Sequence, residues 1–451
     1  MSPQPRLFGT DGIRGRFGAP PLDRDTVTAL GVHLAATLRE SSPGEPPLVV
    51  LGGDTRESTP ALCLWLAAGL AAGGAAIRFA GVIPTPGVAW LTRDLAAAAG
   101  AVVSASHNPY PDNGIKLLDP LGFKWSDEAE AALEARLATG PTVPAVDQDL
   151  TADPELRESY LRRLAATVPR TAEPPLAGLK IVLDTGNGAA AASAGELFTR
   201  LGAAVTLLHA APDGRNVNAG CGSTAPEEMA ARVVAEKADL GAAFDGDADR
   251  CILADDQGEI RDGDAILYLW ATALQARGEL SPSRIVATTM SNLGLERALA
   301  REGIGIERCD VGDRYVVEAM RRTGIVLGGE QSGHIVESRL TSTGDGLLTA
   351  VQMAALVRQA GQPLSRLLAG FRRYPQVLLN VRVARKPDLT TLPRVAAAAQ
   401  SVEERLGEDG RLVLRYSGTE PLARVMIEGP DQPAIEALAA ELAGVIAAEL
   451  S

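Results

Sequence analysis

The sequence predicts an α/β protein of three similar βαβ-type domains with mixed, mostly parallel sheets, plus a smaller C-terminal α+β domain, around a central cleft. Two observations support this prediction. One plan of strand, helix, strand, helix, strand occurs three times, over residues 48–107, 179–250 and 284–334. Alternation of this kind favours parallel sheets that helices cover on both faces. After Pro375 the plan stops, and shorter alternating strands with two helices follow.

Each repeat begins with an apolar strand and ends with one that runs into a polar loop. The opening runs are 48–55, 179–188 and 284–289, and the closing strands lead into polar loops at Ser106–His107, Asp245–Arg250 and Glu330–His334. Ligands in such sheets bind beyond the carboxyl ends of the strands, so the three polar loops are expected to share one cleft. Composition shifts divide the chain into four predicted domains: 1–152, 153–256, 257–371 and 372–451.

Composition excludes several classes of function. The chain of 451 residues has a net charge of −13 and no long basic run, so we expect no nucleic-acid partner. Its four cysteines include no CxxC pair, which favours reduced thiols over a zinc site or disulfides. The first residues show no secretory pattern, and the longest apolar stretch, 61–77, is too short for a bilayer. We therefore expect a cytoplasmic protein with no membrane partner.

The stretch 102–116 combines an apolar strand with reactive side chains. Ser106 and His107 follow the strand, and a turn at Asp112-Asn113-Gly114 leads to Lys116. Loops on rigid scaffolds carry reactive groups, which makes Ser106 a candidate nucleophile. The alternative is that its hydroxyl only satisfies backbone groups of a tight turn.

Asp245-Gly246-Asp247-Ala248-Asp249-Arg250 predicts a metal site. In an extended segment the three carboxylates share one face, and their mutual repulsion calls for a cation. Oxygen ligands of this kind suit Mg²⁺, and the pattern does not fit an EF-hand loop. The alternative is a solvated acidic turn.

Three further loops are candidates for binding anions or sugars. Two guanidinium groups, those of Arg415 and Arg424, flank a glycine turn in the segment that runs from Arg415 to Pro421 and beyond. This arrangement is typical of phosphate binding, and the alternative is a helix N-cap. Glu330 and Ser332 suit sugar hydroxyls, and His334 is either a proton relay or a satisfied turn histidine. Gly9 to Gly15 displays Arg14 in a glycine-punctuated loop, a weak anion signal.

Other motifs do not fit. Gly186-Asn187-Gly188 follows a strand, but the acidic residue of a dinucleotide site is missing, so its glycines are expected to pack a helix against the strand. Ser106 lacks a nucleophile elbow, and no P-loop sequence is present.

Together the four motifs Ser-Ala-Ser-His-Asn-Pro, Asp-Gly-Asp-Ala-Asp-Arg, Gly-Glu-Gln-Ser-Gly-His and Arg-Tyr-Ser-Gly-Thr-Glu-Pro resemble those of the α-D-phosphohexomutase superfamily. The similarity covers essentially the whole chain and is greatest to the bacterial phosphoglucosamine mutase branch. It implies a four-domain isomerase that interconverts glucosamine 6-phosphate and glucosamine 1-phosphate through a phosphoserine and a bound 1,6-bisphosphate. Such an enzyme supplies UDP-N-acetylglucosamine and cell-wall synthesis.

The resemblance also implies roles for individual residues. Ser106 would be the phosphoserine and would hold one Mg²⁺ together with Asp245, Asp247 and Asp249. Arg14, Lys116 and Arg250 would surround the transferred phosphoryl group, with Lys116 or His334 as proton carrier, while Glu330 and Ser332 would contact the sugar. The non-reacting phosphate would be bound by Arg415, Ser417, Gly418, Thr419 and Arg424, on a fourth domain expected to move as a lid.

Partners and alternatives follow from the same resemblance. The expected partners are small sugar phosphates, with glucosamine 1,6-bisphosphate or glucose 1,6-bisphosphate as activator, and the expected state is a monomer or homodimer. A glucose or mannose phosphomutase, a serine-dependent metal phosphatase and a non-catalytic sugar-phosphate binder remain as alternatives.

Overall fold

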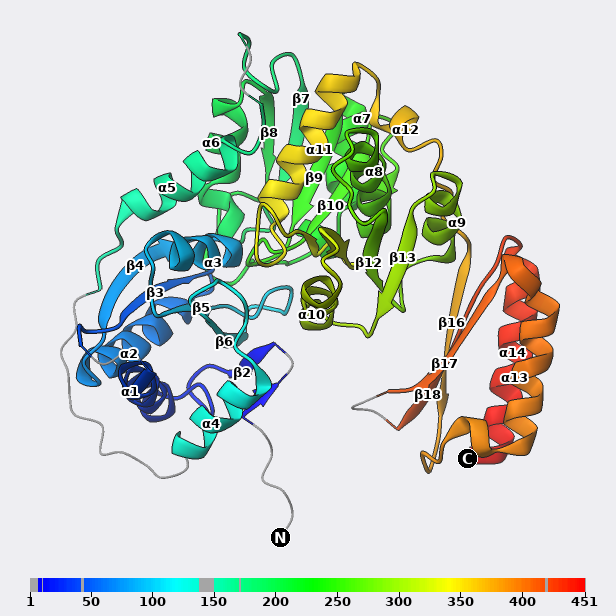
Figure 1. Cartoon of the computed structure of the whole chain (residues 1–451), viewed down its shortest axis with the longest axis horizontal. Coiled ribbons are helices and arrows are strands. Elements are labelled where there is room, and N and C mark those ends of the chain that lie inside the picture. Colours follow the sequence, from blue (N-terminus) through cyan, green and yellow to red (C-terminus); the bar gives the residue numbers. More distant parts are fainter. Residues whose placement is uncertain are drawn as a thin grey trace. The chain divides into compact units, whose positions relative to one another are not determined.

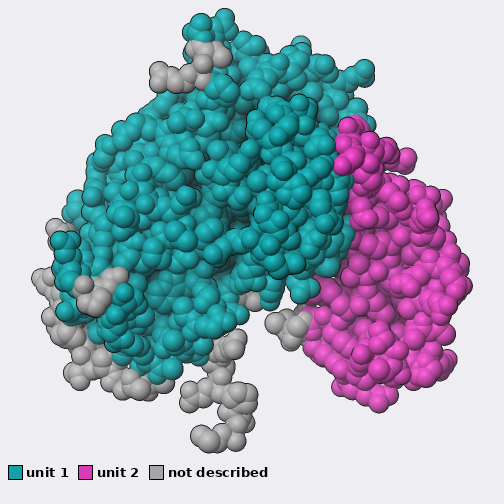
Figure 2. Space-filling model, viewed as in Figure 1, with its two compact units in different colours: residues 1–290, 304–369 teal, residues 291–303, 370–451 magenta. Residues whose placement is uncertain are grey.

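The computed structural model describes residues 7–9, 11–41, 44–137, 150–169, 172–417 and 421–450. The described chain forms four sheets and divides into two compact units, residues 1–290 with 304–369 and residues 291–303 with 370–451 (Figures 1 and 2). Unit 1 contains three sheets with flanking helices, and unit 2 contains the fourth. This confirms the predicted mixed α/β sheets and the smaller C-terminal α+β part. Parallel and antiparallel pairings are equally frequent among the named strands of unit 1, so its sheets are mixed without being mostly parallel. Among the described helices, none combines the length and apolar character needed to cross a membrane.

The first sheet of unit 1 has six strands in the order β1-β2-β6-β5-β3-β4. β3 is parallel to β4 and β5, whereas β6 returns antiparallel to β5. The elements of this part of the chain are β1 (Phe8–Gly9), β2 (Gly12–Arg16), α1 (Arg24–Ser41), β3 (Leu48–Gly53), α2 (Thr59–Ala72), β4 (Ala76–Val82), α3 (Thr85–Asp94), β5 (Ala99–Val103), β6 (Asp112–Leu118), α4 (Asp127–Leu137) and α5 (Pro154–Ala165).

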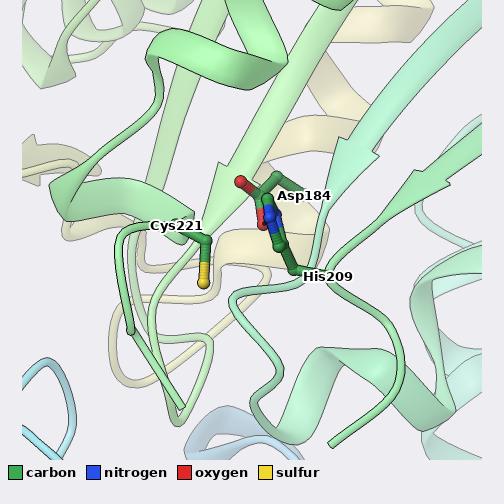
Figure 3. A group of neighbouring side chains, drawn as sticks. All are labelled: Asp184, His209 and Cys221. Carbon is green, nitrogen blue, oxygen red and sulfur yellow. Dashed lines mark ion pairs between the residues drawn. The ribbon is translucent and has the colours of Figure 1, made fainter. Parts of the chain in front are cut away.

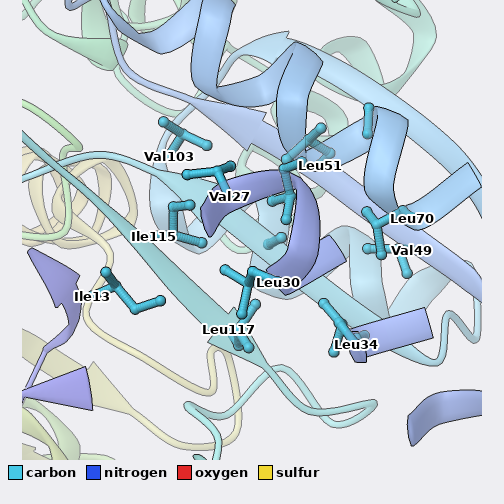
Figure 4. Packing of buried hydrophobic residues seen from close by; sticks show 14 of the residues in the cluster. Ile13, Val27, Leu30, Leu34, Val49, Leu51, Leu70, Val103, Ile115 and Leu117 are labelled. Atoms are coloured by element: carbon cyan, nitrogen blue, oxygen red, sulfur yellow. The ribbon is translucent and has the colours of Figure 1, made fainter. Parts of the chain in front are cut away.

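The core of this sheet follows from the periodicity of its sequence. Val27, Leu30 and Leu34 lie on one face of α1 at helical spacing and are buried (Figure 4). They pack against strand residues two apart, such as Ile115 and Leu117 of β6, which point to the same side of the sheet. Each fully buried aliphatic side chain of this kind contributes about 1.5–3 kcal/mol.

Helices α1 and α2 approach each other closely because glycines face one another at their crossing. A Cβ on Gly69 would lie 2.0 Å from the carbonyl oxygen of Thr28, and one on Gly31 would lie 2.5 Å from that of Leu66. Any larger residue at either position would force the two helices apart.

The second sheet has the order β11-β10-β9-β7-β8, in which β7 is parallel to β8 and β9, and β10 is antiparallel to β9. Its elements are β7 (Lys180–Asp184), η1 (Ala189–Ala192), α6 (Ala194–Arg200), β8 (Ala204–Leu208), η2 (Gly222–Thr224), α7 (Glu227–Glu236), β9 (Leu240–Phe244), β10 (Cys251–Asp255) and β11 (Ile260–Arg261).

The third sheet has the order β13-β12-β14-β15, in which β12 is parallel to β13 and β14, and β15 is antiparallel to β14. Its elements in unit 1 are α8 (Gly263–Ala276), β12 (Arg284–Thr288), β13 (Gly305–Cys309), α10 (Asp313–Thr323), β14 (Leu327–Gly329), β15 (Ile335–Glu337), α11 (Gly346–Ala360) and α12 (Leu364–Leu367).

Unit 2 is built on the antiparallel sheet β16-β18-β17. Apolar residues of the sheet and of its two long helices, such as Val425, Val395 and Leu442, form one buried cluster. The unit also includes α9, which lies between β12 and β13 in the sequence. Its elements are α9 (Leu293–Arg301), β16 (Gln376–Arg382), η3 (Leu389–Thr391), α13 (Pro393–Leu406), η4 (Gly407–Asp409), β17 (Arg411–Tyr416), β18 (Leu422–Glu428) and α14 (Gln432–Leu450).

The three sheets of unit 1 share one local motif that positions polar groups. In each, a central parallel strand turns back into an antiparallel neighbour: β5 into β6, β9 into β10, and β14 into β15. The loops of these hairpins contain Ser106, the acidic run from Asp245 to Arg250, and the run from Glu330 to His334. Equivalent positions in three sheets therefore present three different sets of functional side chains.

Candidate active site

Ser106 lies in the loop between β5 and β6, where its side chain meets the acidic loop of the second sheet. The residue is 2% exposed, and its hydroxyl donates a hydrogen bond of 2.6 Å to Oδ2 of Asp245. Nδ1 of His107 lies 3.4 Å from the same hydroxyl. Ser106 has a φ of 50°, a left-handed conformation that non-glycine residues adopt at a cost of about 1–2 kcal/mol. Strained backbone conformations cluster at active sites, so a hydroxyl held next to a carboxylate in this way indicates a catalytic role for Ser106.

The acidic loop brings its three carboxylates together, as predicted, but not in an extended conformation. The segment is a turn, closed by a hydrogen bond of 3.0 Å from the amide of Ala248 to the carbonyl of Asp245, and Ala248 has a φ of 54°. The sequence analysis attributed the convergence of the carboxylates to an extended segment in which alternate residues share one face, and this explanation is wrong. The side chains of Asp245, Asp247 and Asp249 converge because the turn folds them inward, to within 4.8 Å of one another.

The electrostatics of this cluster favour a cation. Burial, with the neighbouring carboxylates of Asp249 and Asp247, raises the pKa of Asp245 well above its usual value. Burial and Asp247 likewise raise the pKa of Asp249. For Asp247 burial also acts upward, but the charge of Lys116 and the hydrogen bonds from Lys116 and Thr85 together outweigh it and lower the pKa of that carboxyl.

The donor set fits a divalent metal ion with oxygen ligands. Oδ1 of Asp247 and Oδ1 of Asp249 are buried and have no hydrogen-bond partner among the described residues. Buried acceptors of this kind are costly unless something binds them. Hard cations such as Mg²⁺ take carboxylate oxygens and leave positions for phosphate or water. The buried acidic cluster can therefore bind a metal.

Lys116, on β6, lies beneath this cluster and is 1% exposed. Its ammonium is 2.9 Å from Oδ2 of Asp247, 3.2 Å from Oδ2 of Asp11 and 3.6 Å from Oδ2 of Asp249. Burial lowers the pKa of Lys116, but these carboxylates outweigh it and hold the pKa well above its usual value. Arg250 adds a second cation: its amide donates to Oδ1 of Asp245, and its guanidinium lies 3.9 Å from Oδ1 of Asp249.

The third loop presents sugar-type donors and acceptors together with one histidine. Oε1 of Glu330 accepts a hydrogen bond from the amide of Gly312, and the hydroxyl of Ser332 has no partner among the described residues. Nε2 of His334 accepts a hydrogen bond of 3.1 Å from the amide of Gly344. This bond assigns the proton of the neutral imidazole to Nδ1.

A cavity of about 1050 Å³ in unit 1 joins the three loops. Ser106, Asp249, Arg250, Glu330, Ser332 and His334 all line it, and Arg14 lines it from the N-terminal segment. The predicted residues of unit 1 thus lie at or directly beneath one cavity, which is large enough for a hexose phosphate.

Sequence reasoning missed several charged residues of this cavity region, among them Asp11 and Lys124. Asp11, between β1 and β2, forms ion pairs with Arg14, Lys116 and Lys124. Lys124 also pairs with Asp313, at the start of α10, and so connects the first and third sheets. The only sequence signal for Asp11 is its position in the predicted glycine-punctuated loop. Its partners Lys116 and Lys124 are more than a hundred residues away in the sequence, so no local pattern indicates the ion pairs.

In unit 2, the predicted phosphate-binding residues lie on neighbouring strands. Arg415 of β17 and Arg424 of β18 are directly opposite each other in the antiparallel ladder. β18 spans Leu422–Glu428, so the helix N-cap alternative is wrong. Lys386, which the sequence analysis did not identify, donates a hydrogen bond of 2.6 Å to the carbonyl of Ser417. Gly418 and Thr419 lie outside the described residues.

A second group with metal-ligand side chains consists of Asp184, His209 and Cys221 (Figure 3). Both oxygens of Asp184 already accept backbone hydrogen bonds of 2.9 Å, from Gly186 and Gly222, and Nδ1 of His209 lies 3.1 Å from Oδ1. Asp184 therefore fixes the segment between β7 and η2. Gly188, in the same segment, packs against the backbone of Gly246 in the acidic loop, not between helix and strand as expected.

These features define a phosphohexomutase, and the chain belongs to the phosphoglucomutase/phosphomannomutase family. α/β/α domain I of that family matches residues 5–143, domain II residues 158–258, domain III residues 262–374 and the C-terminal domain residues 378–445. Within the family, its curated relatives include phosphoglucosamine mutases. The chain is 46% identical to that of Solibacter usitatus (98% of this chain, 99% of the relative) and 47% identical to that of Symbiobacterium thermophilum (99% and 100%).

Solved structures share the fold. A phosphoglucomutase/phosphomannomutase family protein from Burkholderia thailandensis superposes with a TM-score of 0.80 at 24% identity, over 98% of this chain and 97% of that one. N-acetylphosphoglucosamine mutase from Aspergillus fumigatus, in complex with GlcNAc-6P and magnesium, gives a TM-score of 0.66 at 18% identity, over 98% and 96%.

Proposed function

We propose that the protein is an isomerase that interconverts glucosamine 6-phosphate and glucosamine 1-phosphate. The observation that carries this proposal is the hydroxyl of Ser106, 2.6 Å from Asp245, at a cavity that also exposes Arg14, Arg250 and Glu330. Relatives over the full chain that bear the name phosphoglucosamine mutase support the choice of sugar.

In the proposed mechanism, Ser106 carries a phosphoryl group. The 1-hydroxyl of glucosamine 6-phosphate attacks the phosphorus, the bond from phosphorus to Oγ of Ser106 breaks, and a 1,6-bisphosphate results. Of the two predicted proton carriers, Lys116 is held as a cation, so the hydroxyl proton passes to Nε2 of His334, which lies 3.7 Å from Oδ2 of Asp313.

The bisphosphate then rotates by half a revolution within the cavity. Oγ of Ser106 attacks the 6-phosphoryl group, the bond from phosphorus to the 6-oxygen breaks, and glucosamine 1-phosphate is the product. The carrier returns the proton to the 6-oxygen when the 6-phosphoryl group leaves. Glu330 and Ser332 orient the sugar in both halves of the reaction.

Phosphoryl transfer depends mainly on positioning and on neutralising charge. Arg14, Lys116 and Arg250 supply fixed positive charge around the transferred group. Asp245, Asp247 and Asp249, with the phosphoryl group on Ser106, would hold Mg²⁺, which neutralises charge on the phosphoryl oxygens when bound.

The remaining parts of the proposal concern partners and setting. Arg forks bind phosphate oxygens bidentately, so the arginines of unit 2 are assigned to the non-reacting phosphate, with the residues Arg415, Ser417, Gly418, Thr419 and Arg424. Glucosamine 1,6-bisphosphate or glucose 1,6-bisphosphate would serve as activator. We propose a cytoplasmic monomer or homodimer, consistent with four unpaired cysteines.

The test is ³¹P NMR of the phosphorylated enzyme with Mg²⁺ and a trace of bisphosphate. The 6-phosphates of glucosamine, glucose and mannose are supplied in parallel. We expect glucosamine 6-phosphate to be converted fastest to its 1-phosphate. Faster conversion of the glucose or mannose compound would reassign the sugar, and release of free phosphate alone would make the protein a phosphatase. Ser106→Ala is the matched control, and unchanged turnover in this variant would refute the mechanism.

A further inference from the structure

We propose that Arg56 is a positioning residue that holds the loop of Ser106 in its strained conformation and so aligns the Ser106 phosphoryl group for transfer. The inference rests on the proposed function, because it assumes that Ser106 is the phosphoryl carrier. Arg56 lies between β3 and α2, does not line the cavity, and is 1% exposed.

The guanidinium of Arg56 binds the Ser106 loop through its backbone. Nη2 donates to the carbonyl of Ser106 at 2.8 Å and to that of Asn108 at 2.7 Å. Nη1 donates to the carbonyls of Pro109 at 2.6 Å and Asp112 at 3.0 Å. Four carbonyl groups of one loop thus converge on one buried side chain. Only the planar fork of arginine offers donors in this arrangement.

The same arginine is connected to the other side of Ser106. Nε of Arg56 donates to Oδ2 of Asp54 at 2.8 Å, and the hydroxyl of Ser104 donates to that oxygen at 2.6 Å. Oγ of Ser104 in turn accepts the amide of Ser106 at 2.9 Å. Both backbone polar groups of Ser106 are therefore fixed, directly or through two side chains, by the Arg56–Asp54 ion pair.

The second sheet contributes one more donor to the same carbonyl groups. Nδ2 of Asn218 donates to the carbonyl of Ser106 at 2.9 Å and to that of Asn108 at 3.3 Å. Asn218 belongs to the segment that Asp184 fixes at its two ends, through Gly186 and Gly222. The carbonyl of Ser106 is thus held from both sides of the junction between the first and second sheets.

This arrangement has a consequence for phosphoryl transfer. The left-handed φ of Ser106 persists only if the surroundings outweigh its cost. Without the Arg56 fork, the loop would relax toward ordinary φ values, and Oγ would move away from Asp245 and from the in-line direction of attack. A displacement of about 1 Å can lower a rate roughly 100-fold. Because Arg56 does not line the cavity, we expect substrate affinity to be unchanged.

The test compares the wild type with Arg56→Lys in a single-turnover assay. The charge beside Asp54 is kept, but the fork to four carbonyls is lost. Enzyme phosphorylated at Ser106 is mixed with glucosamine 6-phosphate in a rapid-quench apparatus, and the rate is expressed per phosphoserine, counted by intact-protein mass spectrometry. We expect the transfer rate to fall roughly 10- to 100-fold, with the half-saturating sugar phosphate within twofold of the wild type. A purely structural role would lower the amount of folded, phosphorylated enzyme but not the rate per phosphoserine.

Arg261→Lys is the matched control. Arg261 also forms an ion pair with a buried aspartate, Asp255, but its hydrogen bonds go to no residue of the Ser106 loop. It should transfer at the wild-type rate. An Arg56→Lys enzyme that transfers at the wild-type rate per phosphoserine overturns the inference.

If Arg56→Lys does not fold, Asn218→Gly gives the same test, since Asn218 has a φ of 56° that glycine adopts without strain. This variant removes one donor from the same carbonyl groups and should slow transfer roughly threefold to tenfold by the same loss of alignment, whereas an unchanged rate overturns the inference. Failure of the proposed function is distinguishable, because then the wild-type enzyme itself would transfer nothing from Ser106.

Discussion

Replacing Lys116 with methionine should destabilise unit 1 strongly in the absence of divalent cations and much less in their presence. The ammonium of Lys116 is 2.9 Å from Asp247 and 3.6 Å from Asp249, and both groups of the closer pair are at most 2% exposed. Removing one partner of a buried, hydrogen-bonded ion pair costs about 3–5 kcal/mol, because the other charge remains buried without compensation. At about 2–4 °C per kcal/mol, the midpoint of thermal unfolding should fall by roughly 6–20 °C.

Differential scanning calorimetry in EDTA and in millimolar Mg²⁺ measures this effect. A cation bound by Asp245, Asp247 and Asp249 replaces part of the lost positive charge, so Mg²⁺ should narrow the gap between Lys116→Met and the wild type. The double variant Lys116→Met/Asp247→Asn should recover part of the stability in EDTA, and the exposed control Lys180→Met should match the wild type. A shift of under about 2 °C in EDTA, or a gap that Mg²⁺ leaves unchanged, would refute the reasoning.

Three further predictions concern other parts of the chain. Burial raises the pKa of Asp345 to about 6, so the folded state binds more protons than the unfolded state between about pH 4 and pH 6, and stability falls as pH rises through that window. Asp345→Asn removes this dependence, which unfolding midpoints at pH 4, 5, 6 and 7 would reveal; parallel profiles for the two proteins would contradict it. Glu428, which is fully buried in an ion pair of 2.6 Å with Arg411, anchors unit 2. Glu428→Ala should destabilise that unit by about 3–5 kcal/mol, seen as faster hydrogen exchange in β16–β18 than in unit 1, and equal protection would argue against the anchor. A Cβ on Gly188 would lie 2.5 Å from the carbonyl oxygen of Gly246. Gly188→Ala should therefore move the acidic loop and weaken Mg²⁺ binding roughly 10- to 100-fold. Isothermal titration calorimetry measures the affinity for Mg²⁺, and an unaltered value would show that the contact between Gly188 and Gly246 does not position the carboxylates.

Much of the fold could be predicted because its determinants are local. Alternating apolar runs and alanine-rich helices identify the strands and helices of each repeat, and β18 was visible in the alternation of Leu422–Glu428. The recruitment of α9 into unit 2 was not visible, since it depends on contacts between residues far apart, such as the hydrogen bond of 3.0 Å from Asn292 to Glu428.

The candidate site was predictable in its members and less so in its geometry. Motifs identified Ser106, the three aspartates and Lys116, but their convergence depends on a turn at Ala248 that an extended segment does not make. Asp11 and Lys124 carried no signal, because their ion pair spans 113 positions of the chain. Arg56 follows a strand end in Gly-Asp-Thr-Arg, yet nothing local indicates that its acceptors lie some fifty residues later.

The three hairpins at equivalent places in three sheets also fix the order in which the lining of the cavity is synthesised. The proposed phosphoryl carrier, metal ligands and sugar contacts are encoded in succession, so a nascent chain has the serine loop before Glu330 to His334 have been translated. Until then the lining of the cavity at Ser106 is incomplete, and a truncated chain that ends with β14 lacks Glu330, Ser332 and His334. Such a fragment would contain the proposed phosphoryl carrier but none of the proposed sugar contacts, so it should not convert a sugar phosphate.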